Sequence, residues 1–295
     1  MASTAVVENA SGSAESPWIL VVCACAEEAR FVRDALEGLV VGESSAPLRR
    51  PLARGRISGT ATEESIRVEV MTCGIGEVDA TMATAALLVE RHGKREPPPA
   101  CVLSVGCTGA HGPGIRPGDV VLGTSIVPLA CRMVRSDGSS EHVGHRFSTS
   151  RDPLSELACD AKLLKVAREA ASSAVLPPWP TIPGVRPTVH EGKVGSTDTW
   201  TQDTVEIRRL HSELGTLCEE MEAYGVARVC TECGDGDSVL PFLAIKDIAN
   251  NELDSDINSG EETGMGESII LEEIGRRASI VAVATIRRLV DEGTM

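Results

Sequence analysis

The chain has 295 residues, 42% of them hydrophobic, so it is long enough to bury one large core or two smaller ones. It carries 28 Lys and Arg residues against 43 Asp and Glu residues, and the net charge of -15 would repel a phosphate backbone, which excludes nucleic acid as the expected partner and favours a small-molecule ligand. No apolar run approaches the ~20 residues that a membrane-spanning helix needs, so no membrane association is expected.

Residues 1–16 are predicted to be a disordered tail, and residues 17–295 a single folded domain. The tail lacks the basic start and apolar middle of a signal peptide, and it contains no Arg, which argues against a transit peptide. The ten cysteines are spread through apolar runs such as "VVCACA", as small buried side chains in a reducing compartment would be. We therefore expect a cytoplasmic protein.

Short apolar segments with strand character alternate with helical segments along the rest of the chain. The predicted strands are 18–24, 66–72, 100–106, 118–124, 189–195 and 239–246. The predicted helices are at about 26–38, 77–92, 154–174, 202–214, 221–233 and 265–292. This alternation predicts an α/β fold, a single domain whose mixed central β-sheet is flanked by helices.

Two segments interrupt the alternation, and no internal repeat is visible. Residues 41–65 are predicted to form a polar hairpin or loop. Residues 129–188, with "SDGSSEH" and "LPPWPTIPGVRP", are predicted to elaborate the site or a subunit contact.

Polar and glycine-rich turns follow the predicted strands, where sites in such sheets lie. These turns are "CAEEA", "CGIGEVDA", "GCTGAHGPG", "GSTDTW" and "KDIANN", and we expect them to face one pocket. A further stretch, "LCEEMEAYGVA" (217–227), places Glu219, Glu220 and Glu222 in a segment predicted to be a buried strand running into a helix.

The sequence stretches that resemble metal-binding or cofactor-binding motifs are each incomplete. Cys230 and Cys233 form a C-x-x-C without a second pair at zinc spacing. The stretch that begins at Asp254 has its glycine one place late for a calcium loop, and Met265 at its twelfth position. "GIGEVD" lacks the third glycine of a dinucleotide site. We expect neither a metal nor a cofactor.

Four motifs in order resemble the nucleoside phosphorylase and nucleosidase superfamily, and within it most the 5′-methylthioadenosine/S-adenosylhomocysteine nucleosidases. They are "CACAEEARFVRDAL", "GIG", "VGCTGAHGPGIRPGDVV", and "EEMEA" followed by "AIKD". The resemblance runs from about residue 18 to residue 290 and implies that 17–295 is a nucleoside phosphorylase-like catalytic domain. It also implies a homodimer with sites near the subunit contact.

The resemblance implies roles for single residues. Glu222 binds the ribose hydroxyls with Met221 packed beneath the sugar, Asp247 protonates or hydrogen-bonds N7 of the purine, and Trp200 stacks on the base. Glu220 is the family's companion acid, with no role assigned here, and Glu219 is expected to face solvent or a neighbouring turn. The remaining residues expected to line the pocket are Ile75, Cys107, Thr108 and Gly109.

The type of residue at position 28 distinguishes a hydrolase from a phosphorylase in this superfamily. Phosphorylases of this superfamily grip phosphate with an Arg in the turn after the first strand and a second Arg on a later strand, where this chain has Glu28 and Ser104. A carboxylate would repel phosphate, and in the nucleosidases it activates water. The resemblance therefore implies hydrolysis of the N-glycosidic bond of a purine nucleoside such as 5′-methylthioadenosine or S-adenosylhomocysteine, with a role in purine and methionine salvage.

Alternatives stay open. Lys246 stands where the nucleosidases commonly have Ser, and a cation there is expected to lower the pKa of Asp247 and weaken it as an acid. "STDTWTQD" is similar to a uridine phosphorylase loop, which leaves the base open. The chain could be a phosphate-dependent phosphorylase for purine nucleosides or uridine, with phosphate contacts from Arg30, Arg116 or another subunit. It could also be a catalytically silent nucleoside-binding member.

Overall fold

The computed structural model describes residues 17–45, 48–130, 132–142, 156–234, 238–253 and 271–294. Its main sheet has the strand order β11-β10-β6-β12-β5-β1-β4-β3-β2, with the short β9 paired to β6. The strands are β1 (Trp18–Cys23), β2 (Glu37–Glu43), β3 (Pro51–Ser58), β4 (Ser65–Thr72), β5 (Cys101–Ala110), β6 (Val120–Pro128), β9 (Leu157–Ala158), β10 (Val189–Ser196), β11 (Thr216–Glu220) and β12 (Phe242–Asn250). Two further strands, β7 (Arg132–Val134) and β8 (Ser140–His142), form a separate hairpin.

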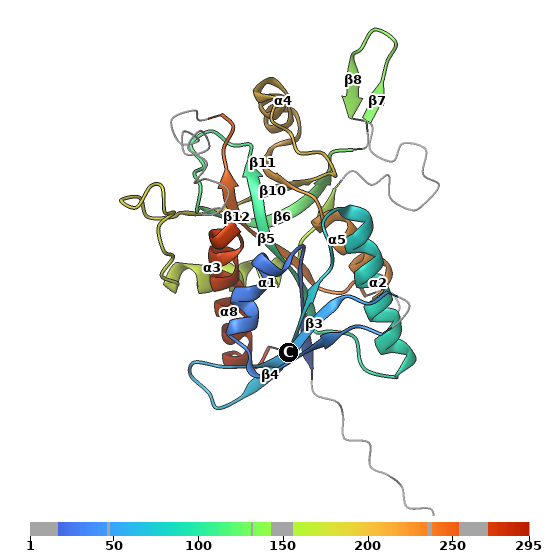
Figure 1. Ribbon diagram of the computed structural model, residues 1–295, viewed down its shortest axis with the longest axis vertical. Coiled ribbons are helices and arrows are strands. Elements are labelled where there is room, and N and C mark those ends of the chain that lie inside the picture. The colour runs from blue at the N-terminus through green and yellow to red at the C-terminus, as the bar shows by residue number, and fades with distance from the viewer. Residues whose placement is uncertain are drawn as a thin grey trace, which may run out of the picture.

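Helices cover both faces of the sheet (Figure 1). One layer holds α1 (Ala26–Asp34), α3 (Ala161–Ser173) and α8 (Arg276–Asp291), and the other holds α2 (Glu77–Gly93) and α5 (Ala223–Glu232), with α4 (Thr204–Leu214) near the end of β10. The central strand β1 pairs in parallel with β4 and β5 and is buried along its whole length, as expected for a strand covered on both faces. Among the helices that the structure describes, none is long and apolar enough to cross a membrane.

The sheet closes on itself at one end. β5 pairs with β12, β12 with β6, β6 with β10, and β10 with β11, and β11 returns to pair antiparallel with β5. In this last pairing Glu219 lies opposite Gly109 and Cys218 opposite Ala110. The closure therefore brings the "GCTGA" end of β5 against the acidic end of β11.

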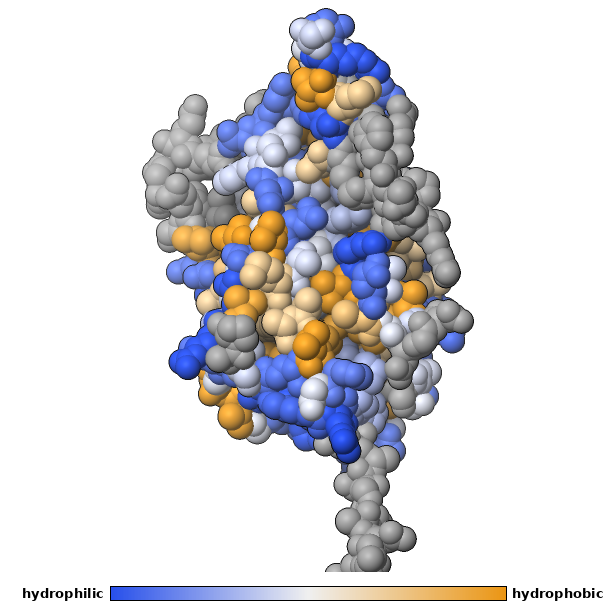
Figure 2. Space-filling view, turned by 90° about the vertical axis from the view of Figure 1, so that its right-hand side faces the viewer, coloured by the Kyte–Doolittle hydropathy of each residue, from blue (hydrophilic) through white to orange (hydrophobic). Residues whose placement is uncertain are grey.

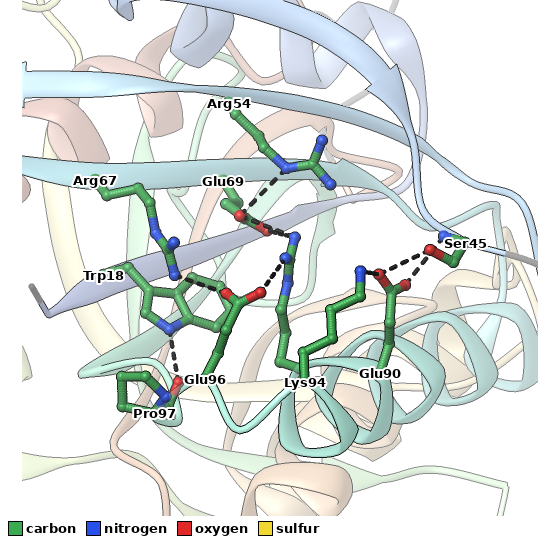
Figure 3. A network of polar contacts seen from close by, with 10 residues as sticks. Trp18, Ser45, Arg54, Arg67, Glu69, Glu90, Lys94, Glu96 and Pro97 are labelled. Carbon is green, nitrogen blue, oxygen red and sulfur yellow. Dashed lines mark hydrogen bonds and ion pairs between the residues drawn. The ribbon is translucent and has the colours of Figure 1, made fainter. Parts of the chain in front are cut away.

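Ion pairs around the buried Glu69 and the partly buried Glu96 join the end of α2 to the sheet (Figure 3). Nη2 of Arg91, a side chain on α2 that is almost fully buried, lies 3.0 and 2.8 Å from the two carboxylate oxygens of Glu69 on β4. Arg54 on β3 reaches the same carboxylate at 3.3 Å. Arg91 also donates to Glu96 at 2.9 Å, and Arg67 on β4 pairs with Glu96 at 3.2 Å. These contacts fix α2 relative to β3 and β4.

The predicted fold class is confirmed, and the structure moves several boundaries. Residues 41–65 do contain a hairpin, but its strands β2 and β3 extend the main sheet, and β3 buries Leu52, Ala53 and Ile57. The helix predicted at 26–38 ends at Asp34, and the one predicted at 154–174 begins at Ala161. The prediction of a tail at residues 1–16, the apparent calcium loop at Asp254, and the start of the helix predicted at 265–292 lie outside the described residues.

Two strands run further than predicted. β5 continues to Ala110, so Cys107, Thr108 and Gly109 lie within a strand rather than after it. β12 spans Phe242–Asn250, so Asp247 lies inside a buried strand and does not begin the turn that follows. These four site residues therefore lie on sheet positions, which hold side chains more rigidly than turns do.

Candidate active site

Glu28 lies in the first turn of α1, directly after β1, and its carboxylate is 4% exposed. One oxygen accepts a hydrogen bond from the backbone N–H of Ala24 at 2.9 Å, and the other accepts from the backbone N–H of Cys107 at 2.7 Å. A Cβ at Gly106 would lie 2.6 Å from Oε1 of Glu28, so only glycine leaves room for this carboxylate beside β5. The buried carboxylate is thus satisfied by two backbone amides, one directly after β1 and one on β5.

Asp247 on β12 is fully buried and lies in register with Cys107 on β5. Its two carboxylate oxygens accept hydrogen bonds from the backbone N–H groups of Gly275 at 2.9 Å and Arg277 at 3.1 Å, at the start of α8. Burial raises the pKa of Asp247 to about 7, although the two amides and the charge of Arg277 act to lower it. A carboxyl group with this pKa holds a proton about half of the time near neutrality.

Glu222 precedes α5 and is also buried. Its Oε1 accepts a hydrogen bond from the backbone N–H of Gly76, in the turn between β4 and α2, at 2.9 Å. Burial, together with the charges of Glu220 and Glu28, raises the pKa of Glu222 to about 7, while Lys246 and the Gly76 amide act to lower it. Glu28 and Glu222, which lie in different elements, are therefore close enough to affect each other electrostatically.

The structure explains why Glu220 is buried at the end of β11. It ends β11, and its carboxylate accepts hydrogen bonds from the backbone N–H groups of Glu222 at 3.1 Å and Ala223 at 2.8 and 3.0 Å, which begin α5. The Nζ of Lys246 lies 2.9 Å from Glu220 Oε2, and both side chains are almost fully buried. Glu220 thus caps the helix that follows Glu222, with a buried lysine as its counter-ion.

The expectation that Lys246 lowers the pKa of Asp247 is wrong. Successive side chains of a strand point to opposite faces of the sheet, so Lys246 turns away from its neighbour and toward Glu220. Burial then dominates at Asp247 and raises its pKa. Burial lowers the pKa of Lys246, but the charges of Glu220, Glu222 and Glu28 outweigh burial and leave it above its ordinary value.

Glu219 was expected to face solvent or a neighbouring turn, and the structure favours the second alternative, because this carboxylate is buried against the end of β5 and binds the loop between β10 and α4. Its Oε2 lies 3.1 Å from Nε2 of the buried His111, and its Oε1 accepts a hydrogen bond from the backbone N–H of Thr201 at 2.7 Å. The backbone carbonyl of Glu219 accepts a hydrogen bond from the hydroxyl of Thr108 at 2.5 Å. Glu219 therefore anchors the loop that carries Trp200.

The other predicted pocket residues lie nearer the surface. Trp200 is 67% exposed in the loop between β10 and α4, Ile75 is exposed in the turn before α2, and Met221 is half-buried between Glu220 and Glu222. The loop of Trp200 also meets the turn of Ile75, because Asp198 accepts a hydrogen bond from the backbone N–H of Glu77 at 2.7 Å. The structure thus brings the carboxylates together in the interior, while Trp200 and Ile75 lie at the surface.

Several groups that hold these side chains were not predicted. They are the backbone amides of Gly76, Gly275 and Arg277, the glycine at 106, and the Lys246 ammonium. For two of them the sequence held a usable feature, because Gly76 and Gly275 are glycines directly before a helix. In the structure their φ angles are 102° and 74°, in the region that favours glycine. Nothing local marks Gly106 or the partner of Lys246.

A separate hollow of about 530 Å³ lies between α1, α3 and α8. Its lining includes Phe31, Ala170, Arg276, Val283 and Arg287, and none of the candidate site residues lines it. Within the described residues, no group of three or more His, Cys, Asp or Glu side chains is arranged to hold a metal ion.

The fold agrees with the family comparisons. The model of the phosphorylase superfamily matches residues 19–287, so the chain belongs to this superfamily. It is 24% identical over 267 residues to a 5′-methylthioadenosine/S-adenosylhomocysteine nucleosidase of Geobacillus kaustophilus, over 90% of this chain and 95% of that protein.

Two solved structures also resemble the chain. One is the 5′-methylthioadenosine/S-adenosylhomocysteine nucleosidase of Neisseria meningitidis in complex with methylthio-immucillin-A, with a TM-score of 0.66 and 21% identity over 92% of this chain and 98% of that one. The other is futalosine hydrolase of Helicobacter pylori, with a TM-score of 0.68 and 18% identity over 95% of this chain and 100% of that one. At these identities the structural likeness establishes the fold, and the predicted family is confirmed by the family model.

Proposed function

We propose that the chain hydrolyses the N-glycosidic bond of a purine nucleoside such as 5′-methylthioadenosine or S-adenosylhomocysteine, and releases the free base and the ribose derivative. The observation that carries this proposal is Glu28, a buried carboxylate in the turn after β1. The family resemblance puts the phosphate-gripping Arg of the phosphorylases at this position, and a carboxylate there repels an anionic nucleophile. The names of the relatives, nucleosidases rather than phosphorylases, support the same activity.

The proposed roles follow from the chemistry of the bond. Its cleavage develops positive charge on the sugar and negative charge on the leaving purine, so an acid is needed at the base and a carboxylate at the water. We assign Glu28 to the activation of water, Asp247 to N7 of the purine, and Glu222 to the ribose hydroxyls. Asp247 is fully buried, so its contact with a base requires its side chain or the start of α8 to move.

The arginines considered for phosphate binding support hydrolysis by their positions. Arg30 lies two residues after Glu28 on α1, and its guanidinium stacks on Phe31 at 4.5 Å and donates to the carbonyl of Glu272. Residues two apart on a helix do not face each other, so Arg30 points away from Glu28. Arg116 is exposed in the turn before β6.

A direct assay tests the proposal. The protein is incubated with 5′-methylthioadenosine, S-adenosylhomocysteine, inosine and uridine, each with and without inorganic phosphate, and the free base is measured. We expect base to be released from a purine nucleoside equally well without phosphate. Strict dependence on phosphate would instead identify a phosphorylase, and binding of nucleoside without turnover a silent member.

We further propose that the chain forms a homodimer through the exposed face of α2. Val78, Met82 and Val89 project from this helix into solvent, and Ile75 precedes them in the turn. Figure 2, viewed from the side of α2 and α5, shows apolar side chains gathered in the middle of this face. Contiguous apolar surface of this kind is typical of an association surface.

The dimer is tested by light scattering after size-exclusion chromatography. We expect the wild type to elute as a dimer and Met82→Glu as a monomer, because a carboxylate would be buried at the centre of the contact. Val175→Glu, at an exposed apolar residue after α3, is the matched control and is expected to stay dimeric. A wild type that is monomeric at micromolar concentration would refute this part of the proposal.

A further inference from the structure

Lys246 is a buried cation placed among three carboxylates. It lies on β12 next to Asp247, is 2% exposed, and faces the opposite side of the sheet from that residue. Its Nζ is 2.9 Å from Oε2 of Glu220. A lysine is almost never fully buried unless it is paired, so its presence here calls for a role.

A chain of contacts joins Lys246 to the residue assigned to the sugar. The Glu220 carboxylate that binds Lys246 also accepts hydrogen bonds from the backbone N–H groups of Glu222 and Ala223. The backbone position of Glu222 is therefore set from one side by Glu220, while its side chain is held by the Gly76 amide at 2.9 Å. Displacement of the Glu220 carboxylate would release the first of these two constraints.

Lys246 also affects the ionisation of Glu222 through its charge. The charged and titratable groups that act on Glu222 are Glu220 from β11, Glu28 from α1, Lys246 from β12 and the thiol of Cys73 after β4. Of these, Lys246 alone carries positive charge. Without it, Glu222 would share a buried space with two other carboxylates and no cation, and its ionised form would be strongly disfavoured.

We propose that Lys246 is a positioning residue for sugar recognition: it holds the Glu220 carboxylate on the amides that begin α5, and thereby favours the ionised form of Glu222 and aims it at the ribose hydroxyls. The inference rests on the proposed function and deepens it, because it names what sets the selectivity for a ribose with free hydroxyl groups. Only ionised Glu222 can accept hydrogen bonds from both hydroxyls with its full strength.

The test variant is Lys246→Met, which keeps the length of the side chain and removes its charge. We expect KM for the ribonucleoside to rise about tenfold or more, with a smaller change in kcat, because ground-state binding of the sugar is weakened. The 2′-deoxy analogue lacks one of the hydroxyls, so its kinetics should change less, and the preference for ribose should fall. The acid limb of kcat/KM should move up by about one pH unit or more.

A double variant separates charge from folding. Lys246→Met combined with Glu220→Gln removes both charges, and the glutamine carbonyl can still accept from the α5 amides. We expect it to fold even if Lys246→Met alone does not, and to bring the ribose preference and the acid limb back toward those of the wild type. Lys193→Met is the control, since this partly exposed lysine pairs only with Glu156 among the described residues.

The results for the variants test the role of Lys246 independently of the proposed hydrolysis. Unchanged ribose preference and an unchanged acid limb in Lys246→Met would overturn it, as would a double variant as impaired as the single one. If the wild type turns over no nucleoside, the proposed function fails, and the same preference is measured by calorimetric binding of adenosine and 2′-deoxyadenosine to the same variants. A wild type that binds neither would overturn both.

Discussion

Glu28 on α1 accepts a hydrogen bond from the backbone N–H of Cys107 on β5 at 2.7 Å, although the two residues are 79 positions apart in the chain. The contact joins the motif that carries the proposed water-activating carboxylate to the motif expected to line the sugar and base pocket. It also leaves each oxygen of Glu28 with a further lone pair, since each accepts only one of the two hydrogen bonds described. Each oxygen therefore keeps a lone pair that could accept a hydrogen bond from a water molecule while the contacts that fix the carboxylate remain.

Replacing Glu28 by Gln tests its role as the base. Glu28→Gln should lower kcat about 10²- to 10⁴-fold, because the amide cannot take a proton from water. The NH₂ group must face one of the two backbone donors, so a stability loss of about 1–3 kcal/mol is expected, measured by urea unfolding, with the fold retained.

Glu27→Gln is the matched control, because this exposed neighbour lies in the same turn of α1. It should keep nearly full activity and stability. If Glu28→Gln retained a near-normal kcat while Glu27→Gln did the same, the assignment of Glu28 would be refuted.

The pH dependence of the rate tests Asp247. Since its pKa is raised to about 7, the proton donor is lost as the pH rises, and kcat/KM should fall above about pH 7. Asp247→Asn should abolish turnover, because the amide has no proton to give to the purine. A wild-type kcat/KM that stays level from about pH 6 to about pH 9 would argue against Asp247 as the acid.

The raised pKa of Asp247 should also make the stability of the fold depend on pH. The pKa of Asp247 is raised from 3.8 to about 7, so below about pH 4 the carboxyl is protonated in both the folded and the unfolded chain. Between these two values the unfolded chain releases its proton first, and the folded state loses up to about 4 kcal/mol of relative stability. The unfolding temperature of Asp247→Asn minus that of the wild type should therefore increase from pH 4 to pH 7 and then level off. A constant difference would show that Asp247 titrates normally.

Much of the fold followed from local pattern, and the exceptions have a common cause. The strands at 18–24 and 66–72 were recognised because their apolar runs are buried in parallel pairings. The end of β12 was missed because Lys246 and Asp247 interrupt its apolar run, so the strand is predicted to end at Lys246. Their charges are tolerated inside the strand because Glu220 and the amides of α8 satisfy them, and these partners are distant in sequence.

The roles of the site carboxylates also could not be predicted from local pattern. The family motif indicated a function for Glu222, but periodicity did not distinguish it from Glu219 and Glu220. Their roles depend on partners from other elements: Gly76 for Glu222, Lys246 for Glu220, and His111 for Glu219. Residues of one type in one short stretch can thus be separated only after the sheet has closed.

Trp200 is expected to report ligand binding directly. It is exposed in the described structure, whereas the other two tryptophans, Trp18 and Trp179, are buried. Adenine should therefore change the tryptophan fluorescence of the wild type but not of Trp200→Ala. Loss of the stacking platform should raise KM about tenfold. The unfolding temperature should hardly change, because the side chain makes little buried contact.

Val205→Ala is a suitable control, since it truncates an exposed apolar side chain in the helix that follows the same loop. It should keep both the fluorescence change and KM. An adenine-dependent signal that persists in Trp200→Ala would place the base elsewhere.

The ion pairs of Figure 3 predict a large stability effect that leaves the chemistry intact. Arg91→Met removes the cation that lies between Glu69 and Glu96, and Glu69, which is 1% exposed, keeps only the longer contact to Arg54. Loss of one partner of a buried pair costs about 3–5 kcal/mol, which should appear as a lower midpoint in urea unfolding. The kcat of the folded fraction should be unchanged, because none of these residues touches the candidate site.

Lys94→Met provides the comparison at the end of the same helix. Lys94 is half exposed and pairs with Glu90 across one helical turn, so its loss should cost less than about 1 kcal/mol. Added salt screens exposed pairs more than buried ones, so about 1 M NaCl should erase the small effect of Lys94→Met and leave most of the effect of Arg91→Met. Equal costs for the two variants, or equal sensitivity to salt, would mean that the Glu69 pair is not buried from solvent as the structure has it.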